Sequence, residues 1–156
     1  MSRQQAIARA EQGFDNGQFW QDLADLVAQE TESQVPGRGD ALHAYLTETL
    51  APHLVALSMT TRLLPNPAPG GAPFLLAERI EAPDLPTVLS YGHGDVTRAQ
   101  TDAWAEGLHP FRLTQRGDRF YGRGSADNKG QHLVNLTALR AHLDRHGFPM
   151  VEIVDS

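Results

Sequence analysis

The chain has 156 residues, of which 13 are basic and 19 acidic, so its formal net charge is -6. This length predicts one domain or part of a larger one, and 40% hydrophobic residues predict a folded core. The lack of a basic stretch argues against nucleic-acid binding, and no apolar segment is long enough to span a membrane. The absence of cysteine excludes disulfides and thiolate ligands. We therefore expect a cytoplasmic protein whose metal ligands would be nitrogen and oxygen atoms.

Hydrophobic residues recur at helical spacing in two segments of the first third of the chain. The segment 18–30 places Phe19, Leu23 and Leu26 on one stripe. A second stripe follows the breaker 36–39, with Asp40 as its N-cap and Pro52 near its end. The sequence predicts an amphipathic helix in each segment.

The rest of the chain alternates between strand and helix patterns. Short leucine-rich or β-branched runs predict strands at 58–64, 74–80, 87–91 and 150–154, and 111–115 and 119–121 form a hairpin about Gly117. A long helix begins at Asp127 or Asn128, runs to about Arg145, and is ended by Gly147 and Pro149. This order predicts an α/β fold, a three-layer sandwich with a mixed, mainly parallel sheet.

The first candidate site comes directly after the predicted strand 87–91. His93 and Asp95 are two positions apart and lie among glycines that permit a tight turn. An imidazole can bind zinc while a nearby carboxylate orients the ring. Taken alone, the pair also fits a turn histidine with an aspartate that accepts backbone N–H bonds.

The second candidate site precedes the long helix, in the glycine-rich segment 122–130. Asp127 is a candidate ligand here, but Asp127 or Ser125 could equally cap the helix. The spacing does not match a phosphate-binding loop. Lys129 is the single lysine beside twelve arginines, which a purely capping role does not explain.

Five ordered elements make the region 86–139 resemble a known family. They are Gly-His-x-Asp-Val at 92–96, Trp104, Pro-Phe at 110–111, Tyr-Gly-Arg-Gly at 121–124, and Asp-x-Lys-Gly at 127–130. The sequence resembles the amino-terminal part of the dinuclear zinc peptidases and deacylases, which include aminoacylase, acetylornithine deacetylase, succinyl-diaminopimelate desuccinylase, carnosine dipeptidase and glutamate carboxypeptidase. An unrelated α/β binding protein would need all five elements to coincide by accident.

The resemblance implies roles for three residues. His93 would bind one metal, Asp127 would bridge two zinc ions, and Asp95 would be the catalytic-site acid that orients the histidine. It also implies a cis peptide bond between Asp127 and Asn128, and cobalt as an alternative metal. The expected activity is hydrolysis of the amide bond of a dipeptide or N-acyl amino acid by a zinc-activated water. The resemblance is also compatible with a homodimer of the complete protein.

The family pattern also requires groups that we cannot place in these 156 residues. The family's Glu-Glu pair, which contains the general base, has no counterpart, because Glu152 lies in a predicted strand and Asp155 is a single acid. We therefore expect residues 1–156 to form the amino-terminal part of a catalytic domain, without the dimerisation domain, and to be inactive alone. The alternative is a non-catalytic remnant that persists as a folded or subunit-pairing module.

The remaining histidines have no sequence context that indicates a ligand. His109 precedes the Pro-Phe element, and its position near the motifs is compatible with the substrate side, but nothing in the sequence argues for that role. Solvated or half-buried imidazoles on predicted helices are expected for the others, namely His43, His53, His132, His142 and His146.

Overall fold

The computed structural model describes residues 2–146 and 151–155, with side chains through residue 143. The helices and helical turns are α1 (Arg3–Asp15), α2 (Gln18–Ala28), α3 (Gly39–Ala44), the π-helical η1 (Tyr45–Leu50), α4 (Ala51–Ala56), η2 (Thr101–Ala103) and α5 (Lys129–His146). The strands are β1 (Thr60–Leu64), β2 (Phe74–Arg79), β3 (Val88–Gly92), β4 (Thr114–Arg116), β5 (Arg119–Tyr121) and β6 (Val151–Asp155). Every predicted helix and strand is present. Gly147 and Pro149, expected to end α5, lie outside the described residues.

The main sheet has four strands in the order β1-β2-β6-β3, and β4 with β5 forms a separate hairpin. β1 pairs antiparallel with β2, β2 antiparallel with β6, and β3 parallel with β6. The parallel pair is joined by the crossover that contains α5, as parallel strands require. The loop after β3 and the start of α5 therefore lie at the same end of the sheet.

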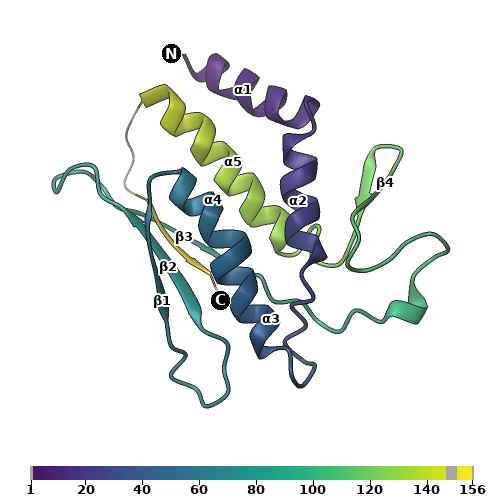
Figure 1. The fold of residues 1–156 in the computed structure, drawn as a ribbon. Coiled ribbons are helices and arrows are strands. Elements are labelled where there is room, and N and C mark those ends of the chain that lie inside the picture. Colours follow the sequence, from purple (N-terminus) through teal and green to yellow (C-terminus); the bar gives the residue numbers. More distant parts are fainter. Residues whose placement is uncertain (1, 147–150, 156) are drawn as a thin grey trace.

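The α/β class and the mixed sheet are confirmed, but the predicted parallel majority is wrong for the described strands. Two of their three pairings are antiparallel: the nine-residue loop 65–73 joins β1 to β2 as a hairpin, and β2 also pairs antiparallel with the distant β6. The helices lie on one face of this sheet (Figure 1). α5 provides the helical crossover between β3 and β6, and the other long helices precede β1.

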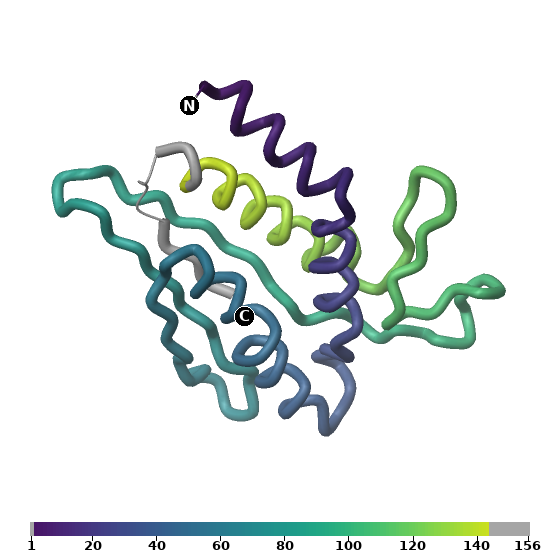
Figure 2. The backbone as a smooth tube through the Cα atoms, turned by 45° about the horizontal axis from the view of Figure 1, so that its top comes forward, coloured from purple at the N-terminus to yellow at the C-terminus, as the bar shows by residue number. Residues whose placement is uncertain are grey.

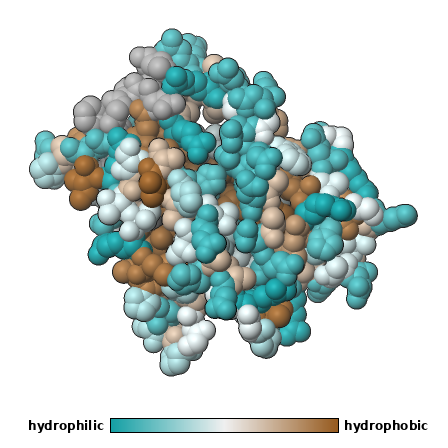
Figure 3. Space-filling model, viewed as in Figure 1, coloured by the Kyte–Doolittle hydropathy of each residue, from teal (hydrophilic) through white to brown (hydrophobic). Residues whose placement is uncertain are grey.

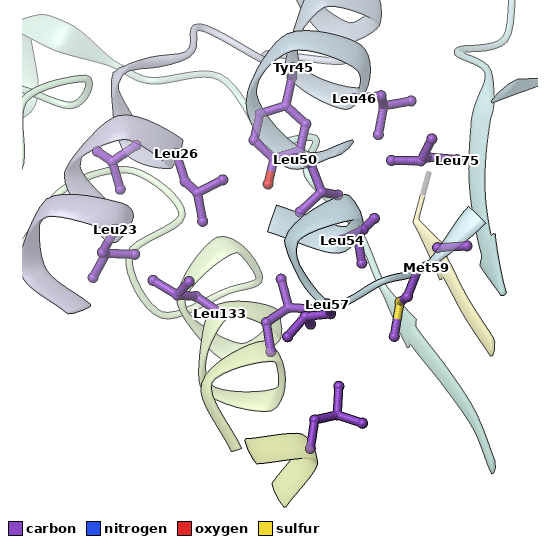
Figure 4. Packing of buried hydrophobic residues seen from close by; sticks show 14 of the residues in the cluster. Leu23, Leu26, Tyr45, Leu46, Leu50, Leu54, Leu57, Met59, Leu75 and Leu133 are labelled. Carbon is purple, nitrogen blue, oxygen red and sulfur yellow. The ribbon is translucent and has the colours of Figure 1, made fainter. Parts of the chain in front are cut away.

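Helices α2, η1, α4 and α5 bury their apolar faces together and against β2. Leu26, Val27, Leu54 and Ala77 are fully buried at the centre of this core. Figure 4 shows the side chains of α2, η1, α4 and α5 converging between the helices and the sheet. This packing fixes α5, and with it the turn before α5, against the sheet.

The first helix was not predicted from the sequence. The hydrophobic pattern of α1 is weak, and in the structure the helix buries none of its residues and leaves Ile7 and Phe14 exposed. It lies alongside α5 in both views of the backbone (Figure 2). Its start is nevertheless a capping box, in which Ser2 and Gln5 bond each other's backbone N–H groups.

The helix predicted to end near Pro52 continues to Ala56. Pro52 lies in the first turn of α4, directly after η1, where the absence of an N–H is tolerated. The π-helical turn places Tyr45, Leu46 and Leu50 in the core. The expected N-cap Asp40 is instead in the first turn of α3, and Arg38 occupies the cap position.

The free strand edge also differs from the sequence-based expectation. For a chain that ends soon after the strand 150–154, the sequence also predicts an exposed apolar flank there and a tendency to self-associate. β6 is instead paired on both sides, and Met150 lies outside the described residues. Among the described strands the two edges of the main sheet are β1 and β3, and in β3 the side chains of Val88, Leu89 and Tyr91 are exposed. Brown apolar patches mark the strand side of the surface in Figure 3. Self-association of the chain stays a prediction.

Candidate metal centre

His93 lies in the loop that leaves β3, and this loop is held from two sides. The backbone N–H of His93 donates to Asn128 Oδ1 at 3.1 Å, which ties the loop to the turn before α5. Thr31 Oγ1 donates to the Gly94 carbonyl oxygen at 2.6 Å in a buried contact. The position of His93 therefore depends on segments that are distant in sequence.

The imidazole of His93 lies between two carboxylates. Its Nδ1 is 3.2 Å from Asp95 Oδ1 and 3.2 Å from the Asp95 carbonyl oxygen. Its Nε2 is 3.5 Å from Asp127 Oδ1. Strand β3 and the α5 crossover thus bring all three predicted site residues together.

This geometry has a chemical consequence at Nε2 of His93. A neutral ring that donates from Nδ1 to Asp95 presents a lone pair to the Asp127 carboxylate, and two electron-rich atoms repel unless a proton or cation lies between them. Nitrogen and oxygen ligands on a tetrahedral zinc, with bonds of about 2.0 to 2.2 Å, are about 3.4 Å apart. The His93 and Asp127 atoms therefore fit two ligands of one zinc ion, with Asp95 orienting the ring.

Asp127 is positioned by a tight turn at the start of α5. Gly124 has φ +80°, which favours glycine, and its carbonyl oxygen accepts from the Gly130 N–H at 3.2 Å. The peptide bond between Asp127 and Asn128 is cis, as the family resemblance implied. The Asp127 side chain is 81% exposed, so it is open to a ligand.

A cavity of about 310 Å³ opens beside these residues. Trp104 and Arg123 form part of its wall, and the Arg123 guanidinium lies 5.8 Å from the centre of the Trp104 ring. Trp104 Nε1 and Arg123 Nη2 both donate to the Ala99 carbonyl oxygen, at 2.8 and 3.1 Å. Lining residues come from both candidate segments: His93, Asp95, Val96, Thr97, Trp104 and 122–127.

The side of the site that faces the core contains a buried histidine. His132 is 5% exposed, so the prediction of a solvated or half-buried ring is wrong for this residue. Burial, followed by the charge of Lys129 and smaller effects of His93 and His53, lowers the pKa of His132 from 6.5 to about 4. His132 is therefore neutral near pH 7.

Other sequence-based candidates are not brought to the cavity. His109 is exposed and absent from the cavity lining. The side chains of Glu152 and Asp155 lie outside those described. Among the described residues, no three His, Asp or Glu side chains are close enough together to hold a metal ion. Sequence reasoning also missed Asn128, although its amide holds the His93 backbone.

Comparison with known proteins agrees with the fold and the order of motifs. The pattern of the peptidase family M20/M25/M40 matches residues 89–154. The cysteinylglycine-S-conjugate dipeptidase of Corynebacterium striatum is 32% identical over 124 residues, covering 78% of this chain and 26% of that protein. The Beta-Ala-His dipeptidase of Mus musculus is 34% identical over 135 residues, with the same two coverages.

A solved structure extends this similarity to nearly the whole chain. Human carnosine dipeptidase 1 superposes with a TM-score of 0.83 at 27% identity, over 98% of this chain and 34% of that one. The matches define an α/β metallopeptidase fold, and they make the chain similar to part of the peptidases of family M20/M25/M40. It spans about a quarter of the length of these curated relatives. None of its described helices is both long and apolar enough to cross a membrane.

Proposed function

We propose that this chain contributes metal ligands to a zinc-dependent hydrolase that cleaves the amide bond of a dipeptide or N-acyl amino acid. Residues 1–156 would form the amino-terminal part of its catalytic domain. The observation that carries the proposal is the 3.5 Å separation of His93 Nε2 from Asp127 Oδ1, with Asp95 on the opposite ring nitrogen. Cytoplasmic location and a homodimer of the complete protein stay predictions.

Each of the three residues has a distinct part in the proposed site. His93 would bind one ion through Nε2, Asp127 would bridge two ions, and Asp95 would keep the proton on Nδ1 of His93. A bound zinc pair would supply an activated water and polarise the scissile carbonyl group. Further ligands and a general base are needed, so this chain by itself should bind zinc weakly and show no turnover.

A zinc titration of the 156-residue chain, followed by NMR, tests the metal centre. Zinc should shift the His93 ring resonances and the backbone signals around Asp127. His93→Ala and Asp127→Ala should each weaken binding by about tenfold or more, because each removes one ligand of an already incomplete set. His109→Ala, a change at an exposed histidine outside the cavity, is the matched control and should leave the titration unchanged.

Two outcomes would contradict the proposal. Zinc or cobalt that leaves the His93 resonances unmoved at millimolar concentration would remove the metal centre. The dipeptide β-alanyl-histidine tests the expected inactivity, since a relative is named for cleaving it. Robust hydrolysis by the pure chain with zinc would disprove the claim that the chain alone lacks a complete site.

Asp95→Asn tests the orienting carboxylate separately. The amide can still reach Nδ1 of His93, but it lacks the negative charge that favours the Nδ1–H tautomer. Zinc affinity should fall about tenfold to 100-fold, as for other carboxylates that support a ligating histidine. The NMR signals of His93 report the tautomer directly, and an unchanged tautomer and affinity would exclude this role for Asp95.

A further inference from the structure

A buried polar cluster lies between the metal centre and the core. It consists of Tyr45 from η1 and of Lys129 and His132 from α5, which are 1%, 0% and 5% exposed. The Tyr45 hydroxyl is 2.8 Å from His132 Nε2, and Lys129 Nζ lies 5.0 Å from the centre of the Tyr45 ring. Tyr45 projects from η1 toward α5 among the core leucines (Figure 4).

One edge of the Tyr45 ring is pressed against the loop that carries His93. A Cβ atom added at Gly94 would come far inside contact distance of the ring carbons of Tyr45, so the ring and the Gly94 backbone are in direct contact. The end of β3 touches the cluster as well, because a Cβ at Gly92 would lie 2.9 Å from His132 Cβ. The glycines on either side of His93 thus permit the close approach of this cluster.

The Tyr45 ring also faces the side chain of Lys129, which belongs to the helix start that follows Asp127. Lys129 is two residues after Asp127, and its Nζ also donates to the Gln29 carbonyl oxygen at 2.8 Å. This bond ties the first turn of α5 to the segment after α2. A single rigid ring therefore contacts both the loop that holds His93 and the side chain of Lys129, two residues after Asp127.

We propose that Tyr45 is a positioning residue that sets the distance between His93 and Asp127 through its contacts with Gly94 and Lys129. The inference rests on the proposed function and deepens it. Metal affinity depends on ligand atoms held within about 0.5 Å, and side chains that touch both ligand segments provide this precision. The aromatic ring, rather than the hydroxyl group, makes the contact with Gly94 and faces Lys129.

A double-mutant cycle between Gly94 and Tyr45 tests this role. Gly94→Ala should weaken zinc binding by about tenfold to 100-fold, because the new methyl group must displace the His93 loop from the ring. In a Tyr45→Leu background the methyl group has space, so the same change should cost less than threefold. Tyr45→Phe keeps the ring and should retain most of the affinity, although it loses the bond to His132.

A metal-free measurement accompanies the cycle. The His93 N–H is bonded to Asn128 Oδ1, so its hydrogen exchange reports whether the two ligand segments keep their spacing. Gly94→Ala and Tyr45→Leu should each accelerate this exchange more than Leu54→Ala, a fully buried core change made as the stability control. Proportional acceleration in all three variants would mean that Tyr45 acts only through global stability.

The results separate this inference from the proposed function. If zinc does not bind the wild-type chain but His93 exchange responds selectively to Gly94→Ala and Tyr45→Leu, the metal proposal fails and the positioning role stands. If zinc binds and the two substitutions have strictly additive effects on affinity, Tyr45 does not set the ligand spacing. If Tyr45→Leu does not fold, the double variant Tyr45→Phe with Gly94→Ala replaces it. This variant keeps the aromatic ring, so the clash with the new methyl group should persist and zinc affinity should stay as low as in Gly94→Ala alone.

Discussion

Gly130→Ala is expected to lower the free energy of unfolding by about 3 kcal/mol and to weaken zinc binding. A Cβ atom at residue 130 would overlap the carbonyl oxygen of Ser125, which is backbone and cannot rotate away. Overpacking of this kind costs about 1 to 3 kcal/mol, and contact with backbone favours the upper end. Relief requires the turn 124–127 to move away from α5, which displaces Asp127. Urea denaturation followed by circular dichroism measures the first effect, and zinc titration the second.

Gly13→Ala is the matched control, because it makes the same substitution inside another helix. No atom lies within 4 Å of a Cβ added at Gly13 in α1. Alanine should therefore raise the free energy of unfolding by about 0.5 to 1 kcal/mol through helix propensity alone. The two substitutions should therefore change the free energy of unfolding in opposite directions. A stabilising Gly130→Ala would mean that the turn before α5 adapts without cost, and that it does not fix Asp127.

The sequence-based prediction of the fold was accurate for local features and less so for features that depend on residues far apart in the sequence. Local patterns located every predicted element, including the hairpin at Gly117, which has φ +63°. The polar helix α1 was missed because its apolar residues are few, although Ser2 and Gln5 already carried a capping-box signal. The place of β6 between β2 and β3 was not predictable from local patterns, because strand order depends on which distant segments pair.

The candidate site shows the same division between local and long-range information. Strand-end rules and motif order were enough to select His93, Asp95 and Asp127, and in the structure each carboxylate lies within 3.5 Å of one nitrogen of the His93 ring. The sequence places Tyr45 in the second predicted helix, but nothing near it in sequence indicates contact with Gly94, 49 positions later. His132 was misjudged for the same reason. The groups that support the site are recognisable only after η1 and α5 have packed together.

Acidification should destabilise the chain through His132. The folded-state pKa of this residue is about 4 against 6.5 in the unfolded chain, chiefly because of burial. Between these values the unfolded state binds more protons at this site, so stability falls as pH decreases from about 6.5 to 4 and is unaffected by this group above 6.5. The full difference corresponds to about 3 kcal/mol. Urea denaturation at a series of pH values measures it.

Other groups titrate in the same range, so the decisive quantity is the difference between the wild type and His132→Gln. Glutamine keeps a polar partner for the Tyr45 hydroxyl but has no proton to gain. The free energy of unfolding of the variant should therefore fall less between pH 7 and 4 than that of the wild type. His109→Gln, at an exposed position, should follow the wild-type profile. Parallel profiles for the wild type and His132→Gln would mean that His132 becomes charged in the folded state at little cost. The Tyr45–His132 cluster would then be hydrated, and it could not hold the His93 loop rigidly in place.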